Sequence, residues 1–345
     1  MAGETLANVT EAARLEAERR GHREATVEHL VLHALSVPEV VARLMREMVS
    51  VTLVREQLDA RLAAAPTGKG YRDGSRAELG AEARAVVDAA RSRGLLRLLR
   101  KEGDRLASSI FEHESTSNIL RAAEWDETAV RRFSARAANA ARKRGHTNVL
   151  SSHALLGLVD DARFAEALEA IGADVAEVRS NLDRIVVRGH RSSKLASPEE
   201  LLTLASVKAN VLQRRTLEVD VLVVDLLRNA PTQKVLSQVG VSSFDLLGAY
   251  VHRAPRQISG AAEGDLEVVF FDDDFTTQEA VVHVLRDVFE HEESRARALM
   301  LEVHRQGSAV VAVLDANDAR ARLDRALDWC RDRMMPLRIV TRPAP

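Results

Sequence analysis

Three consecutive aspartates and one histidine carry most of the chemistry that this sequence offers. Asp272, Asp273 and Asp274 follow an apolar run, and His304 comes later in the chain among apolar residues. Carboxylates accept charge-assisted hydrogen bonds from an ammonium group, and a neutral imidazole nitrogen adds one more acceptor. The pattern therefore predicts a site for a cationic amine.

An apolar floor is expected beside these polar groups. Met300, Val303 and His304 are spaced three and four residues apart, which places them on one face of a helix. Burying a Leu- or Phe-sized side chain of a ligand against such a face contributes roughly 1.5–3 kcal/mol. A structural reading stays open beside this one, because aspartates before a helix are typical N-terminal caps and a Met/Val face is typical of a core.

Other kinds of site lack their required residues. Gly68–Lys69–Gly70 has neither the spacing nor the hydroxyl of a phosphate-binding loop. His291 opens a His-Glu-Glu-Ser-Arg segment with Arg295 where a zinc protease has its second histidine, and the single Cys330 cannot build a multi-thiolate zinc site. We therefore predict no catalytic residue, no metal and no cofactor.

The composition sets the broad class of the protein. A length of 345 residues predicts two or three domains, and 46% hydrophobic residues can bury a core. Lys+Arg (49) nearly balances Asp+Glu (51), and aromatic residues are only 3%, so we expect no nucleic-acid partner. The sequence shows neither a secretory signal nor an apolar run of membrane-spanning length, so we expect a cytoplasmic protein without a membrane partner.

The C-terminal part predicts a small α/β domain. Thr276-x-x-Glu279 reads as a capping box that opens a helix through Phe289, Gly307 reads as a helix end, and Asp315 as a helix start. The predicted order is β-α-α-β-α-β. The strands are expected at 266–271, 309–314 and 336–341, and the helices at about 276–289, 294–306 and 315–332.

The rest of the chain predicts helices and an internal duplication. Helices are expected at about 6–20, 29–35 and 51–62. Gly21–His22 returns as Gly145–His146, and His29 returns as His153 at the same offset, which indicates a duplicated domain. We expect His29 and His153 to be satisfied locally at helix N-termini. The predicted domains are 1–128, 129–252 and 265–345, with a linker at 253–264.

Residues 266–343 resemble the ClpS family, the adaptors that deliver N-degron substrates to Clp AAA+ proteases. The resemblance rests on VVFFDDDFT (Val268–Thr276), ALMLEVHRQGSAV (Ala298–Val310) and MPLRIV (Met335–Val340). It implies that Asp272, Asp274 and His304, with Asp273 between the aspartates, hold the substrate's α-amino group. It also implies a pocket for the N-terminal side chain formed by Thr276, Gln278, Val281, Met300, Val303 and Leu337.

Three positions depart from the pattern of that family. Asp272 replaces the family asparagine and so loses an amide donor, and Gln278 replaces the usual methionine at the mouth of the pocket. Asn317 stands where the family commonly has glutamate in the surface that docks on the ATPase, while Arg322 keeps a basic residue.

Residues 1–252 resemble the N-terminal repeat domain of Clp ATPases, in two tandem copies. TVEHLVLHAL (Thr26–Leu35), the two RGH segments and SHALLGL (Ser152–Leu158) carry this resemblance. Glu28 stands where some members use a glutamate to bind phosphoarginine. The implied partners are a Clp ATPase of the ClpA/ClpC type and N-degron peptides.

The combined resemblance implies a mostly α-helical, non-enzymatic adaptor with two Clp N-like domains and a ClpS-like domain. The two kinds of domain are expected to dock within one chain or between copies. The alternative is a regulatory decoy that competes with the N-terminal domain of a Clp ATPase and has a degenerate or masked peptide pocket.

Overall fold

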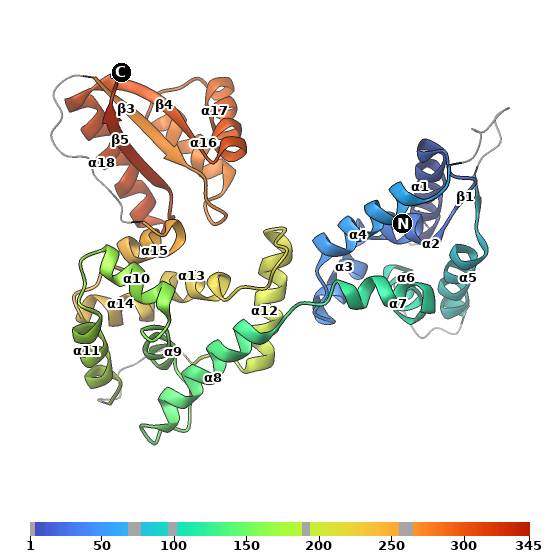
Figure 1. Cartoon of the computed structure of the whole chain (residues 1–345), viewed down its shortest axis with the longest axis horizontal. Coiled ribbons are helices and arrows are strands. Elements are labelled where there is room, and N and C mark those ends of the chain that lie inside the picture. Colours follow the sequence, from blue (N-terminus) through green and yellow to red (C-terminus); the bar gives the residue numbers. More distant parts are fainter. Residues whose placement is uncertain (1–3, 68–76, 96–101, 188–193, 255–264) are drawn as a thin grey trace. The chain divides into compact units, whose positions relative to one another are not determined.

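The computed structural model describes residues 4–67, 77–95, 102–187, 194–254 and 265–345. Figure 1 shows their helices and strands along the chain. Contacts divide the chain into two units, Met1–Arg131 with Pro198–Val219, and Arg132–Ser197 with Asp220–Pro345. Residues 255–264 of the predicted linker lie outside the described part.

The first unit is built from helices and one short pair of parallel strands. Its core packs Ala13 and Ala17 against Leu30 and Val54. Helices were predicted near α1, α2 and α4, whereas α3, which begins at Pro38, was not predicted. The elements are α1 (Glu4–Arg20), β1 (Glu24–Ala25), α2 (Val27–Ala34), α3 (Pro38–Arg46), α4 (Val51–Ala64), β2 (Glu78–Leu79), α5 (Ala81–Leu95), α6 (Glu102–Glu112), α7 (Glu114–Ala122) and α12 (Pro198–Val211).

A buried histidine takes part in capping the N-terminus of α2. His29 Nδ1 accepts a hydrogen bond from the backbone N–H of Thr26 at 3.0 Å, as a glutamine would in a capping box. The proton of His29 therefore lies on Nε2, which donates to Nδ1 of His22 at 2.8 Å. Burial, together with the neighbouring His22, lowers the pKa of His29 to about 4. The expected local role of His29 is confirmed.

The same arrangement recurs at the start of α9 (Ser151–Leu158). His153 Nδ1 accepts from the backbone N–H of Leu150 at 2.9 Å, and its Nε2 lies 2.9 Å from His146 Nδ1. Burial is again the main cause that lowers the pKa of His153 to about 4. A hydrogen-bonded pair of histidines thus occurs at equivalent positions in both segments, which supports duplication of a domain.

Helix α12 packs against α3 in the first unit. Asn210 Oδ1 accepts from the backbone N–H of Val51 at 2.8 Å, at the start of α4, and Ser206 Oγ donates to the Met45 carbonyl at 3.2 Å. The contacts therefore join Pro198–Val219 to the first unit. In the sequence these residues lie within 129–252, the interval predicted as the second domain.

The second unit begins with helices and ends with a small sheet. Helix α8 spans the point at which the two units divide. The helices are α8 (Thr128–Arg142), α9, α10 (Ala162–Ala170), α11 (Val175–Val187), α13 (Asp220–Arg228), α14 (Ala230–Gln238) and α15 (Ser243–His252). The C-terminal module (residues 265–345) has β3 (Asp265–Phe271), α16 (Gln278–Asp287), α17 (Glu293–Gln306), β4 (Ser308–Asp315), α18 (Ala316–Asp332) and β5 (Arg338–Pro343).

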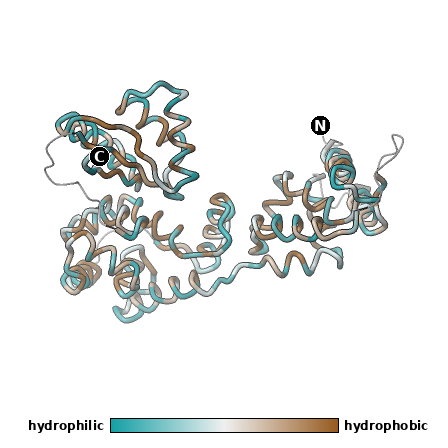
Figure 2. The backbone as a smooth tube through the Cα atoms, turned by 45° about the horizontal axis from the view of Figure 1, so that its top comes forward, coloured by the Kyte–Doolittle hydropathy of each residue, from teal (hydrophilic) through white to brown (hydrophobic). Residues whose placement is uncertain are grey.

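The C-terminal module has the predicted β-α-α-β-α-β order. Its sheet is antiparallel in the order β4-β3-β5, with helices packed against it (Figure 1). Leu266, Val268 and Phe270 alternate along β3 and share one core with α16, α17 and α18. Figure 2 shows hydrophobic stretches of chain in these strands. The predicted fold class, mostly helical with a small C-terminal α/β domain, is confirmed.

Specific residues determine where these helices begin and end. Gly307 has φ +79° and ends α17, and Asp315 accepts from the backbone N–H groups of Asn317 and Asp318 at the start of α18, as expected. The predicted cap at Thr276 is wrong. Thr277 caps α16 by accepting from the Ala280 N–H at 3.3 Å, because the Thr276 hydroxyl donates to Asp273 instead.

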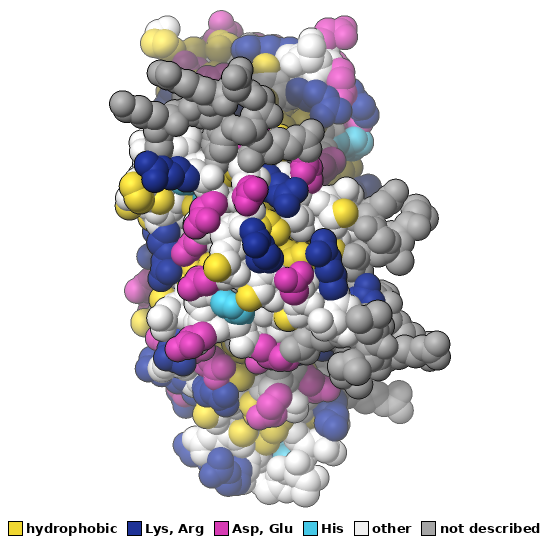
Figure 3. Space-filling view, turned by 90° about the vertical axis from the view of Figure 1, so that its right-hand side faces the viewer, with side chains coloured by type: hydrophobic (Ala, Val, Ile, Leu, Met, Phe, Trp, Pro, Cys, Tyr) yellow, Lys and Arg dark blue, Asp and Glu magenta, His cyan; other side chains and the backbone are white. Residues whose placement is uncertain are grey.

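The surface mixes charges of both signs. On the face of the molecule in Figure 3, acidic and basic side chains are interspersed rather than gathered by sign. Within the described ranges, no helix is both long and apolar enough to cross a bilayer. The same residues contain no cluster of three or more side chains able to hold a metal ion.

Candidate amine-binding site

The turn between β3 and α16 is organised by Asp273. Its Oδ1 accepts from the backbone N–H groups of Phe275 and Thr276 at 2.8 and 2.7 Å, and its Oδ2 accepts from the Thr276 hydroxyl at 2.8 Å. The side chain is only 1% exposed. Asp273 therefore holds the turn in shape and presents little surface to a ligand.

Asp272 and His304 lie side by side at the edge of this turn. The Asp272 backbone N–H donates to the Gly307 carbonyl at 2.9 Å, which ties the end of β3 to the end of α17. The Asp272 carboxylate lies 3.4 Å from His304 Nδ1. The two side chains are 32% and 57% exposed, so both remain accessible to a ligand.

Burial raises the pKa of Asp272 above its ordinary value. The hydrogen bond from His304 acts in the opposite direction, while the nearby Asp273 and Asp274 carboxylates add to the rise. Asp274, the third aspartate, is exposed. A ligand ammonium in this position would offset the crowding of negative charge.

The predicted pocket contains four apolar residues. Val281, Met300, Val303 and Leu337 are all buried and belong to the core of the C-terminal module. The predicted pocket residue Thr276 instead directs its hydroxyl into the turn. These four residues come from α16 (Val281), α17 (Met300 and Val303) and the position just before β5 (Leu337), and their role as the floor of a pocket remains a prediction.

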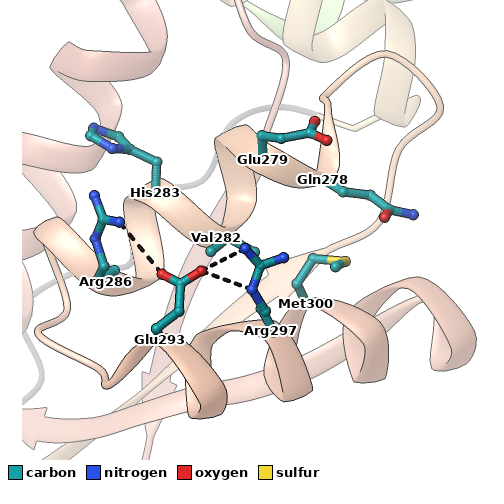
Figure 4. Close-up of a pocket in the computed structure, with 8 residues that line it drawn as sticks. All are labelled: Gln278, Glu279, Val282, His283, Arg286, Glu293, Arg297 and Met300. Carbon is teal, nitrogen blue, oxygen red and sulfur yellow. Dashed lines mark hydrogen bonds and ion pairs between the residues drawn. The ribbon is translucent and has the colours of Figure 1, made fainter.

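An open groove of about 290 Å³ runs between α16 and α17. Figure 4 shows Gln278 and Met300 at one end and the ion-paired Arg286, Glu293 and Arg297 at the other. Arg297 Nε lies 2.8 Å from Glu293, and Arg286 lies 3.4 Å from the same carboxylate. Gln278 and Met300 are therefore the two predicted pocket residues that border open space here.

The residues predicted to dock on a partner have separate environments. Arg322 is 14% exposed and engages Asp318 and Glu290 at 2.9 Å. Asn317 is exposed in the first turn of α18, and Glu28, in α2, lies 4.0 Å from Arg61. Arg322 is thus already held by two carboxylates of its own module.

Two residues outside the predicted site reach its turn. Arg228, at the end of α13, donates from Nη2 to the Phe275 carbonyl at 3.1 Å and from Nε to the Met334 carbonyl at 3.0 Å. His252 Nε2 donates to the Pro336 carbonyl at 2.7 Å. The sequence analysis missed both, because neither has a spacing that links it to residues 272–276.

Two family models match the chain. The model described as ATP-dependent Clp protease adaptor protein ClpS matches residues 262–340. The model described as Clp repeat (R) N-terminal domain matches residues 127–239. The described elements in these intervals are a small α/β module and a set of helices, respectively.

Curated relatives match the C-terminal part of the chain. The adapter protein ClpS 2 of Mesorhizobium japonicum is 38% identical over 77 residues, which cover 22% of this chain and 76% of the relative. The ClpS of Alkalilimnicola ehrlichii is 31% identical over 97 residues, which cover 28% of this chain and 90% of the relative. Among solved structures, Agrobacterium tumefaciens ClpS2 bound to L-phenylalaninamide is 34% identical, with a TM-score of 0.23, over 24% of this chain and all of that one.

Fold, site and matches define a protein in which Clp N-type helical repeats precede a ClpS-type module. Through that module, the chain belongs to the family of ATP-dependent Clp protease adaptor proteins ClpS. The resemblances to ClpS and to the Clp N-terminal repeat domain are confirmed.

Proposed function

We propose that the chain is a non-enzymatic adaptor of a Clp AAA+ protease that binds proteins with a free N-terminal amine and a bulky apolar first residue. Asp272, Asp274 and His304 hold the α-amine. Val281, Met300, Val303 and Leu337 form the floor for the side chain, with Gln278 at its mouth. The partner ATPase is of the ClpA or ClpC type, and the protein acts in the cytoplasm.

One observation carries this proposal. The accessible Asp272 carboxylate lies 3.4 Å from the accessible His304 imidazole, and His304 follows the buried core residue Val303 on α17. An ammonium group finds charge-assisted acceptors there, and an adjoining apolar side chain finds a desolvated surface. The ClpS family of the relatives points to the same use of the site.

The decisive test is the need for a free α-amine. Fluorescent peptides that begin with Phe, Leu, Trp or Tyr are titrated with the full chain, and each is compared with its N-acetylated copy. We expect acetylation to weaken binding at least tenfold, because it removes the charge and hydrogen-bond donors of the ammonium. Equal affinity for both forms would exclude the proposed amine site.

A decoy is the second candidate, and the state of Arg322 favours it. Its guanidinium is held by Asp318 and Glu290, and Asn317 replaces the family glutamate beside it. Docking through this surface would require those ion pairs to break. A decoy would use its Clp N-like helices to compete with an ATPase for adaptors or substrates.

A degradation assay separates the two candidates. Increasing amounts of the chain are added to a Clp protease that is degrading a substrate with an N-terminal Phe or Leu. An adaptor accelerates turnover of this substrate, whereas a decoy slows it. A substrate with an N-terminal Ser is the matched control for effects that do not depend on the degron.

A further inference from the structure

The buried carboxylate of Asp273 raises the question of what stabilises the turn around it. Its hydrogen bonds from Phe275 and Thr276 come from neutral groups of the same turn. A buried carboxylate needs more than neutral donors to offset its lost hydration. Burial lowers the pKa of Arg228, and the charges of Asp225 and Asp273 oppose this lowering.

Arg228 connects the two loops that border the amine site. One of its nitrogens donates to the Phe275 carbonyl in the β3–α16 turn, and another donates to the Met334 carbonyl in the α18–β5 loop. A guanidinium presents its donors in a rigid planar fork, so two simultaneous contacts fix the distance between both loops. Arg228 belongs to α13, outside the module that carries the site.

His252 of α15 makes a second connection at the same place. Its Nε2 donates to the Pro336 carbonyl, next to the pocket residue Leu337, and lies 3.8 Å from the Asp273 carboxylate. Phe244, also of α15, is buried in the core of the C-terminal module and lies 5.3 Å from the guanidinium carbon of Arg331. The donors of α13 and α15 thus reach the two loops that border the site, and Phe244 adds apolar contact with the core of the module.

These contacts leave the amine acceptors open. Asp272 and His304 keep their exposure, and the groove between α16 and α17 stays open as well. Helices α13 and α15 therefore contact the two loops without covering Asp272, His304 or the groove.

We infer that Arg228 and His252 are positioning residues of the amine site. Helices α13 and α15 therefore contribute to peptide binding by the C-terminal module. The inference rests on the proposed function for its peptide readout, but not for its structural readout. It predicts that residues outside the ClpS-like segment control the affinity of that segment for its ligand.

The test compares variants of the full chain. Arg228→Met removes both donors and keeps the apolar stem, whereas Arg228→Lys restores one donor. Arg163→Met is the matched control, because Arg163 likewise donates to a backbone carbonyl, that of Tyr250 in α15, at 3.2 Å. Amide hydrogen exchange is measured over residues 271–279 and 333–339, and the affinity is measured for a peptide with a free N-terminal Phe.

We expect Arg228→Met to speed exchange of the turn at least fivefold and to weaken peptide binding at least fivefold, with Arg228→Lys between it and the unaltered chain. Arg163→Met leaves both quantities unchanged. Unchanged exchange in Arg228→Met, or equal effects in Arg163→Met, would overturn the inference. If acetylation does not affect the unaltered chain, the amine proposal fails, while the exchange result still decides the role of Arg228.

Discussion

At the residue level, three adjacent aspartates have three different environments. Asp273 is buried and holds its own turn, Asp272 faces His304, and Asp274 is exposed. The sequence predicted the cluster and its partner histidine, because both follow from a motif. The sequence could not show which carboxylate is buried and which is accessible to a ligand, since this depends on which side chain points into the turn.

His304 is expected to contribute directly to binding of the α-amine. His304→Ala removes one hydrogen-bond acceptor, which is worth about 1–3 kcal/mol, so affinity for a peptide with a free N-terminal Phe should fall at least fivefold. Fluorescence anisotropy measures this change. Arg305→Ala, at the exposed neighbouring position of α17, is the control and should bind normally. Normal binding by His304→Ala would contradict the assigned role.

Binding is also expected to weaken on acidification through Asp272. Since its pKa is raised, this carboxylate gains a proton at a higher pH than an ordinary aspartate and then loses its attraction for an ammonium. Asp272→Asn cannot titrate, so its affinity should fall less as the pH is lowered. Peptide affinity is measured at a series of pH values for both proteins. Parallel curves would contradict this prediction.

At the level of elements, local signals predicted the helices and strands of the C-terminal module and helices near α1, α2 and α4. The apolar spacing, Gly307 and Asp315 each acted as expected. The strand predicted at 336–341 instead begins at Arg338, because Arg338 pairs with Phe271, where the partner strand β3 ends. Such a shift comes from a contact distant in sequence, which local patterns do not contain.

The histidine at the start of α2 should make stability depend on pH. Its pKa is lowered from 6.5 to about 4, so the unfolded chain binds the extra proton. The stabilisation is complete above pH 6.5 and is lost as the pH falls toward 4, by on the order of 3 kcal/mol. His29→Gln keeps an acceptor for Thr26 and should flatten this dependence.

Urea unfolding at pH 7, 5.5 and 4.5 measures the effect. Trp125 is the tryptophan of the first unit, and a Trp329→Phe background leaves it as the only one in the chain. His113→Gln, a change at a partly exposed histidine of the same unit, is the control. The prediction fails if His29→Gln keeps the full pH dependence of the parent.

At the level of the whole molecule, long-range contacts decide what belongs together. Asn210 caps α4 from a helix far along the chain, and Arg228 and His252 hold the loops of the C-terminal module. The duplication and the order of the modules could be predicted from repeated residues and motifs. These three contacts could not, because each requires the packed structure to bring its partners together.

Asn210 is expected to stabilise the first unit. Asn210→Ala leaves the partly buried Val51 N–H without this acceptor, which costs about 1–3 kcal/mol. Urea unfolding followed by Trp125 fluorescence should show the loss. Thr203→Ala, on the exposed side of the same helix, is the control. Equal stability of the two variants would show that α12 contributes little to the first unit.

The interrupted sequence of the first unit has a consequence for protein synthesis. Its first segment ends at Arg131, but its second segment ends only at Val219. At ~5–20 residues per second, a ribosome needs roughly 5–20 s to add the missing part. Until then, the surface of α3 that receives α12 has no cover, and a chaperone has time to bind there. Nascent chains stalled after residue 131 should therefore be protected from protease less than chains stalled well beyond residue 219.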